Sequence, residues 1–313
     1  MAYEREVMEI PTQPLQLVSV IIPCFNSKST LHKSVDSVLA QTYKAYEIIL
    51  VDDASTDGTA ALVSSLASVT IKAVVLAKNS GAAAARNAGI LQAKGKYIAF
   101  LDSDDTWHPE KLAKQVSQFE QNPHCAIISC DSIFVSEEGR VLKRSHVTRP
   151  PVQGPNAWKT LLAYNFLPTP TVLVKREDAV KCGMFKDGLV VGEDLDLWVR
   201  IAHQGDVAVI DEVLVTILDR PQSLMKENLL ERLDTYVMPM IEGYVKAWDQ
   251  ELSAADKKNI IGQRNFDHAC ISYYNGDLKR SVKGFKEALR QGYRPIKSVS
   301  HLLRLMLRSF LTN

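Results

Sequence analysis

The sequence lacks the features of a membrane-spanning or secreted chain. None of its apolar runs reaches the ~20 residues that a membrane-spanning helix needs. Residues 1–6 carry charges of both signs and lead into no apolar core, so we expect no signal peptide. Cysteine is scarce, and the 5 cysteines lie scattered without metal-type spacing, which indicates free thiols in a reducing cytosol: Cys24, Cys125, Cys130, Cys182 and Cys270.

A strong overall charge is also missing. The net charge of +1 gives the whole chain no attraction for nucleic acid, and we expect no nucleic-acid partner. Hydrophobic residues make up 46% and charged residues 23%, as is ordinary for a globular protein. The 313 residues suffice for one large domain or for a domain with an appendage.

The first third of the chain alternates between two kinds of segment. Apolar runs typical of strands occupy residues 17–22, 46–51, 71–76 and 97–101, and segments with helical spacing separate them. This alternation implies right-handed crossovers and a mainly parallel sheet flanked by helices. The predicted fold class is therefore α/β.

Two of these predicted strands end in carboxylates. The run 97–101 is followed by Asp102-Ser103-Asp104-Asp105, and the run 46–51 by Asp52-Asp53. The carboxyl ends of parallel strands lie on one edge of a sheet, where open α/β sheets bind ligands, so both clusters can meet one ligand. Carboxylate oxygens suit Mg²⁺ or Mn²⁺, which a diphosphate needs. The alternative is that Asp104 or Asp105 caps a helix beginning near residues 108–110.

The rest of the chain is less regular and then becomes helical. Strands are expected at 125–135 and 169–174, and Gly192 precedes a helix. From about Pro221 the pattern is helical throughout. We therefore divide the chain into an N-terminal tail (1–14), a catalytic domain (15–225) and a helical C-terminal extension (226–313).

The end of the extension has the pattern of a basic amphipathic helix. Such a helix suits the surface of an anionic bilayer. The alternative is that its apolar side docks on its own protein. One stripe is basic and the other apolar: Lys297, His301, Arg304 and Arg308 against Val299, Leu302, Leu303, Met306, Leu307 and Phe310.

Five blocks in order, within residues 15–225, carry a resemblance to a known family. They are residues 18–26, 47–59, 81–89, 100–105 and 192–198. Together they resemble family 2 glycosyltransferases. The resemblance implies a GT-A fold, a nucleotide-sugar donor, Mn²⁺ or Mg²⁺, and inversion at the anomeric carbon.

The resemblance also implies which residues bind the donor. Phe25 would offer a flat face to the base, unless it only packs in the core, and Asp53 would accept a hydrogen bond from the uracil ring NH. Arg86 would neutralise Asp53 or reach the diphosphate, unless it is a solvated helix charge. The full predicted donor set is Pro23, Phe25, Asn26, Asp53, Arg86, Asp102 and Ser103.

Metal binding and proton transfer are implied by the two later blocks. Asp104 would coordinate the metal, with Asp105 as neighbour or second ligand, and the cation would stabilise the departing UDP. Asp194 would be the general base, and Glu193 would orient it or contact the acceptor. The alternative is that these acidic residues only offset the helix dipole. Trp198 would line the acceptor site or pack in the core.

The sequence departs from the family pattern in one place. Arg220 and Ser223 match, and Arg220 is assigned to the acceptor side, but the histidine that many relatives carry there is missing. No Gln-x-x-Arg-Trp block is present either, which favours single sugar addition over processive synthesis.

We therefore predict transfer of one sugar from a UDP-sugar to a hydroxyl of a lipid-linked glycan, in cell-surface polysaccharide synthesis. The reaction is expected in the cytoplasm, on the inner face of the plasma membrane. Two alternatives stay open. One is a haloacid-dehalogenase-like phosphatase with Asp102 as nucleophile, and the other is a non-catalytic scaffold at the membrane surface.

Overall fold

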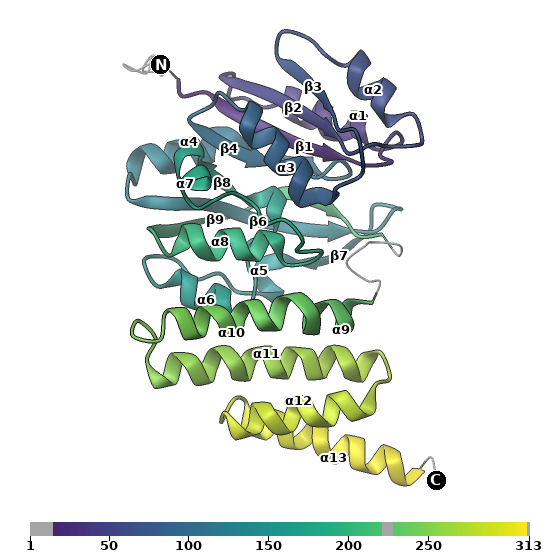
Figure 1. The fold of residues 1–313 in the computed structure, drawn as a ribbon, viewed down its shortest axis with the longest axis vertical. Helices are drawn as coiled ribbons and strands as arrows, with labels where there is room; N and C mark the ends of the chain where they lie inside the picture. The colour runs from purple at the N-terminus through teal and green to yellow at the C-terminus, as the bar shows by residue number, and fades with distance from the viewer. Residues whose placement is uncertain (1–14, 221–227, 312–313) are drawn as a thin grey trace, which may run out of the picture.

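The computed structural model describes residues 15–220 and 228–311 (Figure 1). The predicted tail 1–14 and the residues Pro221, Gln222 and Ser223 lie outside these ranges.

The first third of the chain forms the alternating unit that its sequence predicts. Strands β3, β2, β1 and β4 lie side by side in this order and are all parallel. The apolar runs of β1, β2 and β4 are buried on both sides, as expected for strands with a helix layer on each face, whereas the edge strand β3 is buried at Ile71 and partly exposed beyond it. The elements are β1 (Val18–Cys24), α1 (Leu31–Leu39), β2 (Tyr46–Asp52), α2 (Thr59–Ser65), β3 (Ile71–Val75), α3 (Gly81–Gln92) and β4 (Tyr97–Phe100).

The second third widens this sheet and makes it mixed. Strand β8 pairs antiparallel with both β4 and β6, and β6 pairs parallel with β9. Within the described residues the sheet has nine strands, and the α/β class is confirmed. The elements are β5 (Thr106–Trp107), α4 (Lys111–Gln121), β6 (Cys125–Val135), β7 (Val141–Arg144), α5 (Ser145–Thr148), α6 (Ala157–Ala163), η1 (Thr169–Thr171), β8 (Leu173–Lys175), α7 (Arg176–Lys181), α8 (Glu193–Ala202) and β9 (Asp206–Leu218).

Strand β9 was missed by the sequence analysis. It runs for 13 residues beside β6, with register shifts near Cys130 and Asp131. These shifts break the two-residue alternation of apolar side chains, which is the signal that reveals a strand in a sequence.

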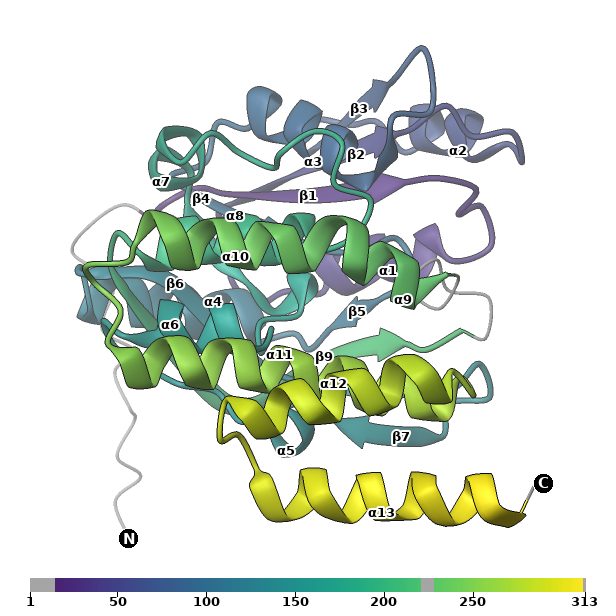
Figure 2. The same ribbon diagram turned by 60° about the horizontal axis from the view of Figure 1, so that its bottom comes forward.

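The last third is helical and stacks below the sheet (Figures 1 and 2). Helix α11 contacts α6 on one side and α12 on the other, and α13 packs against α12. The elements are α9 (Leu229–Arg232), η2 (a π-helical turn, Leu233–Val237), α10 (Met238–Ala247), α11 (Ala254–Tyr274), α12 (Leu278–Arg290) and α13 (Pro295–Leu311). No helix within the described ranges combines the length and apolarity needed to cross a bilayer.

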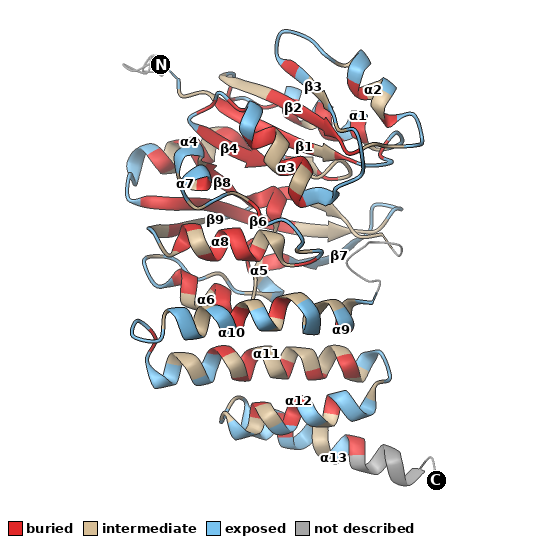
Figure 3. Cartoon of the chain, viewed as in Figure 1, coloured by how far each residue is buried: buried red, intermediate tan, exposed pale blue. Residues whose placement is uncertain are grey.

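Two cores lie on opposite faces of the sheet, because successive strand side chains point to opposite sides. Ile49 and Phe100 point to the face covered by α3, α6 and α8, whereas Ile48 and Leu112 belong to the core on the α1 and α4 side. Figure 3 shows the buried residues concentrated in the strands. A third, smaller core joins α11, α12 and α13.

Candidate active site

The end of β2 is fastened to the start of α3 by Asp53. Its Oδ1 accepts a hydrogen bond from the backbone N–H of Ser80 (2.8 Å) and its Oδ2 from that of Gly81 (2.8 Å). Gly81 has a φ of +87°, which glycine adopts without strain. Asp52 supports the turn, since its carboxylate accepts from the N–H of Ser55. The carboxylate of Asp53 thus holds in place the helix that carries Arg86.

Arg86 joins three separate segments of the chain. Its Nη2 lies 2.8 Å from Oδ1 of Asp102, at the end of β4, and its Nη1 lies 2.9 Å from Oε1 of Glu193, in the first turn of α8. The guanidinium is buried. Burial alone would lower the pKa of Arg86, but the two carboxylates outweigh it and hold that pKa above its usual value. The prediction that Arg86 neutralises Asp53 is wrong, because Asp53 has backbone partners instead.

The residues after β1 form an open turn beside this junction. Phe25 is 45% exposed, so the alternative that it packs in the core is wrong. Asn26 has a φ of +50°, and its Oδ1 accepts from the N–H of Thr56, which ties the β1 turn to the β2 turn.

The β1 turn is also tied to the end of β4. The hydroxyls of Ser27 and Ser103 lie 2.6 Å apart. Pro23 lies within β1, paired with Val51 of β2. Apart from Arg86 on α3, the predicted donor residues therefore lie along the ends of three adjacent strands, with β1 between β2 and β4. Neighbouring strands are ~4.8 Å apart, so β2 and β4, which flank β1, are about 10 Å apart. Asp53 and Asp102, which follow these two strands, therefore suit different parts of one extended ligand.

The acidic group after β4 divides into exposed and buried carboxylates. The side chains of Asp102 and Asp104 are 34% and 33% exposed. Asp105 is buried, and its Oδ1 accepts from the N–H of Leu218 at the end of β9 (2.9 Å). Oδ2 of Asp104 faces Nε of Arg220 at 3.7 Å.

These carboxylates disfavour each other's charge. Burial first and the Asp102 carboxylate second raise the pKa of Asp104, and Arg220 opposes this only in part. Burial and the carboxylates of Asp102 and Asp104 raise the pKa of Asp105 well above its usual value. Although Arg86 pairs with Asp102 and Arg220 faces Asp104, the pKa values of Asp104 and Asp105 stay raised, and the partly exposed carboxylate oxygens of Asp102 and Asp104 fit a hard divalent cation such as Mg²⁺ or Mn²⁺.

The alternative of a helix cap is wrong. Helix α4 begins at Lys111 after Glu110, and no side chain caps it. Asp104 and Asp105 lie too far before its first turn to satisfy its free N–H groups.

Asp194 is held from two sides in the first turn of α8. Its Oδ2 accepts from Nδ2 of Asn165 (3.1 Å) and from Oγ1 of Thr169 (3.2 Å), while its Oδ1 accepts from the N–H of Leu195 (2.6 Å). A carboxylate oxygen accepts about two hydrogen bonds. Among the described residues only the N–H of Leu195 reaches Oδ1, so one acceptor position stays open on this oxygen.

The environment of Asp194 suits a group that takes up a proton. Burial and the neighbouring Glu193 carboxylate raise its pKa to about 6, against the opposing effects of Arg86 and Thr169. General bases work best with a pKa near the operating pH. Asn165 was not predicted from the sequence, and Thr169 was expected in a strand, whereas it begins the turn η1. No motif marks either residue, because they reach Asp194 only through the fold.

Asp196, two residues further on, has a structural role. It is completely buried and accepts from Nζ of Lys186 (2.7 Å), from Arg200 and from the hydroxyl of Tyr244 (2.6 Å). Tyr244 belongs to α10, so this network fastens the C-terminal helices to the helix that bears Asp194.

Trp198 does not line a site in this structure. It is completely buried and packs against the rings of Phe100 (5.7 Å between centroids) and Phe185 (5.8 Å). Its place in the core is the alternative that the sequence had left open.

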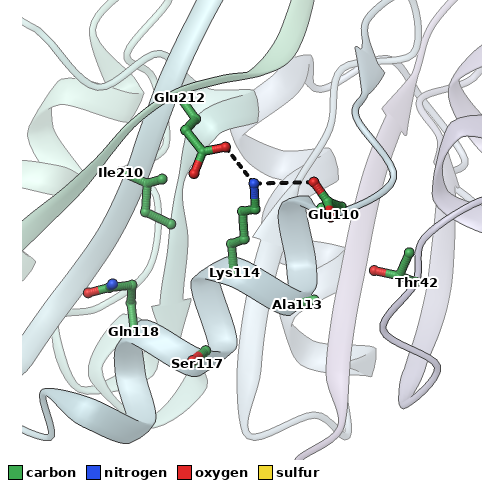
Figure 4. Close-up of a pocket in the computed structure, with 8 residues that line it drawn as sticks. All are labelled: Thr42, Glu110, Ala113, Lys114, Ser117, Gln118, Ile210 and Glu212. Carbon is green, nitrogen blue, oxygen red and sulfur yellow. Dashed lines mark hydrogen bonds and ion pairs between the residues drawn. The ribbon is translucent and has the colours of Figure 1, made fainter. Parts of the chain in front are cut away.

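Two further polar features lie apart from this site. A hollow of about 350 Å³ lies between α4 and β9. Figure 4 shows that Lys114 there pairs with Glu110 and Glu212. The lining of this hollow contains none of the strand-end carboxylates: Thr42, Glu110, Ala113, Lys114, Ser117, Gln118, Ile210 and Glu212.

The second feature is a cluster of Asp131, His146 and Asp211, whose potential ligand atoms lie within 4.8 Å of one another. The guanidinium of Arg144 already pairs with both carboxylates. That cation supplies the charge that a metal ion would otherwise bring.

Comparison with known proteins gives consistent matches. A family model described as Glycosyl transferase family 2 matches residues 19–182. The putative teichuronic acid biosynthesis glycosyltransferase TuaG of Bacillus subtilis is 33% identical over 196 residues, which are 61% of this chain and 74% of that protein. The UDP-Glc:alpha-D-GlcNAc-diphosphoundecaprenol beta-1,3-glucosyltransferase WfaP of Escherichia coli is 34% identical over 193 residues, 61% of this chain and 72% of that protein.

A solved structure shares the fold. The crystal structure of S. aureus TarS 1-349 in complex with UDP-GlcNAc superposes with a TM-score of 0.66 at 21% identity, over 88% of this chain and 81% of that one. This similarity confirms the predicted GT-A type of fold.

Proposed function

The chain belongs to glycosyl transferase family 2, and from that premise we propose that it transfers one sugar from a UDP-sugar to a hydroxyl of a glycan acceptor. The names of its relatives support this class of reaction. WfaP is named for a UDP-glucose donor, and another relative, AmsB of Erwinia amylovora, for amylovoran biosynthesis. Membership of this family also makes the phosphatase alternative for Asp102 wrong.

On the donor side, we assign the uridine to the turns after β1 and β2. The exposed ring of Phe25 offers the base an aromatic face. Each carboxylate oxygen of Asp53 accepts one backbone hydrogen bond and retains acceptor capacity for the uracil N–H. Ser103 and Asp102 follow β4, which is two strands from β2, and we assign them to the ribose and the diphosphate.

For the metal we assign Asp104 together with Asp102. Both have exposed oxygens, whereas Asp105 is buried against β9 and supports the loop. When bound, Mn²⁺ or Mg²⁺ supplies positive charge that stabilises the departing UDP. Arg220, beside Asp104, adds a second cation at the same place.

For the acceptor, we assign Asp194 as general base and its Oδ1 as the oxygen that takes the hydroxyl proton. Asn165 and Thr169 fix the other oxygen, so the carboxylate cannot turn away from the substrate. Direct displacement by the activated hydroxyl inverts the anomeric carbon. Glu193 acts through its ion pair with Arg86, which holds the first turn of α8 in place.

The observation that carries the proposal is the junction at Arg86. One guanidinium contacts both Asp102, on the donor and metal side, and Glu193, the neighbour of the proposed base. Separate segments of the chain are thereby brought into one site, as a transfer between two bound substrates requires.

The deciding experiment is a panel of UDP-sugars with the whole protein and Mn²⁺. Metal-dependent release of UDP from one sugar, together with a rise in melting temperature with UDP and Mn²⁺, is expected. If no donor produces either effect, the result would support the scaffold alternative instead. We further propose a lipid-linked acceptor at the cytoplasmic face of the plasma membrane, supported by the diphosphoundecaprenol acceptor in the name of WfaP.

A further inference from the structure

Helix α13 uses one of its faces to pack on its own protein. Ser298 is completely buried, Leu305 is 3% exposed, and the ring of His301 stacks on Phe285 of α12 at 4.7 Å between centroids. The sequence had placed His301 on the basic stripe, and this is wrong, because its ring belongs to the small core of the three last helices. Burial and the nearby Arg304 and Lys297 lower the pKa of His301, which disfavours its charged form.

A second face of α13 is apolar and has no cover among the described residues. Ile296 is 85%, Val299 43% and Leu303 55% exposed. Their spacing of three and four residues places them on one side of the helix. Figures 1 and 2 show α13 at the outer edge of the molecule, beyond α12. The side chains of Met306, Leu307, Arg308 and Phe310 lie outside the described residues.

The charge of this region is strongly one-sided. Residues 277–305 contain eight lysines and arginines against two carboxylates, a net charge of +6, while the whole chain carries +1. Both carboxylates are already paired, Asp277 with Arg280 and Glu287 with Arg290. All eight cations are exposed: Lys279, Arg280, Lys283, Lys286, Arg290, Arg294, Lys297 and Arg304.

We propose that α12 and α13 form a docking surface for an anionic phospholipid bilayer. We call it the α12–α13 surface and define it by the exposed apolar residues Ile296, Val299 and Leu303 and the eight cations. Apolar side chains enter the boundary between headgroups and acyl chains, while the cations meet the lipid phosphates. Both alternatives expected for this helix are thus met, because one face of α13 packs on its own protein and the other faces the bilayer.

Charge decides between a bilayer and other occupants. A second copy of the chain would bring two surfaces of +6 together, which repel each other. Nucleic acid would pair with the cations but would leave the apolar stripe in water. A bilayer with anionic lipids complements both properties. This proposal does not depend on the reaction that the chain catalyses. Docking on a bilayer would bring the site close to a lipid-linked acceptor.

The test is sedimentation of the full chain with vesicles. Binding is expected with vesicles of phosphatidylglycerol and phosphatidylcholine, and no binding with phosphatidylcholine alone. The double variant Ile296→Asp/Leu303→Asp should raise the lipid concentration for half-binding at least about tenfold. Val69→Asp, at a fully exposed apolar residue in the loop after α2, is the matched control and should bind normally.

A second pair of variants tests the charges. Lys283→Glu/Lys286→Glu should weaken binding by roughly tenfold or more, because the loss of each cation near an anionic surface weakens binding about fivefold. Lys33→Glu/Lys181→Glu makes the same change in net charge elsewhere and should bind normally. Equal loss of vesicle binding in the two double variants would overturn the assignment of binding to the α12–α13 surface.

Two other outcomes would also overturn the proposal. One is equal binding of the unchanged protein and of Ile296→Asp/Leu303→Asp. The other is a dimer by light scattering that the same variant dissociates, without vesicle binding, which would make a second copy the occupant. UDP-sugar hydrolysis is measured alongside, and its persistence in the double variant separates loss of docking from loss of the transferase site.

Discussion

Nη1 of Arg86 lies 2.9 Å from Oε1 of Glu193, although the two residues are 107 positions apart in the chain. The same guanidinium holds Asp102, so helix α3, the end of β4 and the start of α8 meet at one buried cation. The proposed base, Asp194, directly follows Glu193. Its position in the site therefore depends on this ion pair as well as on its own hydrogen bonds.

Replacement of Arg86 by leucine is expected to destabilise the protein by about 3 kcal/mol, because it leaves the partly buried carboxylates of Glu193 and Asp102 without a partner. Urea unfolding measures the change. Arg290→Leu breaks the exposed pair with Glu287 and should change the free energy of unfolding by less than about 1 kcal/mol. Similar effects of the two variants would contradict a structural role for the Arg86 junction.

Asp194→Asn is expected to lower the rate of sugar transfer at least about a hundredfold, because the amide cannot take up the acceptor proton. The affinity for UDP should stay nearly unchanged, since the residue lies on the acceptor side. Transfer assays and UDP titration test both expectations. Turnover close to that of the unchanged enzyme would remove Asp194 from its role.

The pH dependence of transfer is expected to follow Asp194. Its pKa is about 6, so the charged, proton-accepting form is lost as the pH falls through this value, and kcat/KM should fall with it. The hydroxyl of Thr169 favours the charged form, so Thr169→Val should raise the pKa and move the acidic limb to higher pH. Thr169→Ser keeps the donor and should restore the profile. An unmoved limb in Thr169→Val would show that Thr169 does not tune the base.

Asp104 and Asp105 are expected to differ in metal binding. Asp104→Asn removes an exposed ligand and should raise the Mn²⁺ concentration for half-maximal activity at least about tenfold. Asp105→Asn should have a much smaller effect, because the side chain is buried and its amide oxygen can still accept from Leu218. Titration of activity with Mn²⁺ distinguishes the two. The reverse ranking would assign the metal to Asp105.

Gly89 is expected to be required for packing of α3 on β1. A Cβ atom there would stand 2.4 Å from Cγ2 of Ile21, so Gly89→Ala should lower the free energy of unfolding by about 1–3 kcal/mol. Gly243 in α10 has open space around it. Gly243→Ala should therefore raise stability by about 0.5–1 kcal/mol. Thermal or urea unfolding of the pair checks both signs.

Several parts of this structure could be predicted because they depend on neighbouring residues. The four parallel strands follow from short apolar runs between turn residues, and parallel order follows from the helices between them. The acidic strand ends follow as well, since Asp53 and Asp102 stand directly after such runs. The first turn of α8 is marked by Gly192 and the carboxylates after it.

Other parts could not be predicted, because they depend on residues far apart in the sequence. The partner of Arg86 was predicted wrongly, since nothing near it in the chain indicates Glu193. Asn165 and Thr169 belong to no motif, and Trp198 has the same local pattern whether it is buried or lines a site.

The sequence by itself determined the four parallel strands of the first third, their parallel direction and the acidic residues at the ends of two of them, since backbone preference and side-chain period act over a few residues. Only the tertiary structure decided which charges pair, which oxygen of Asp194 stays open and which face of α13 remains exposed. These choices depend on how separate elements pack, because burial favours arrangements in which most polar groups have a partner within hydrogen-bond distance.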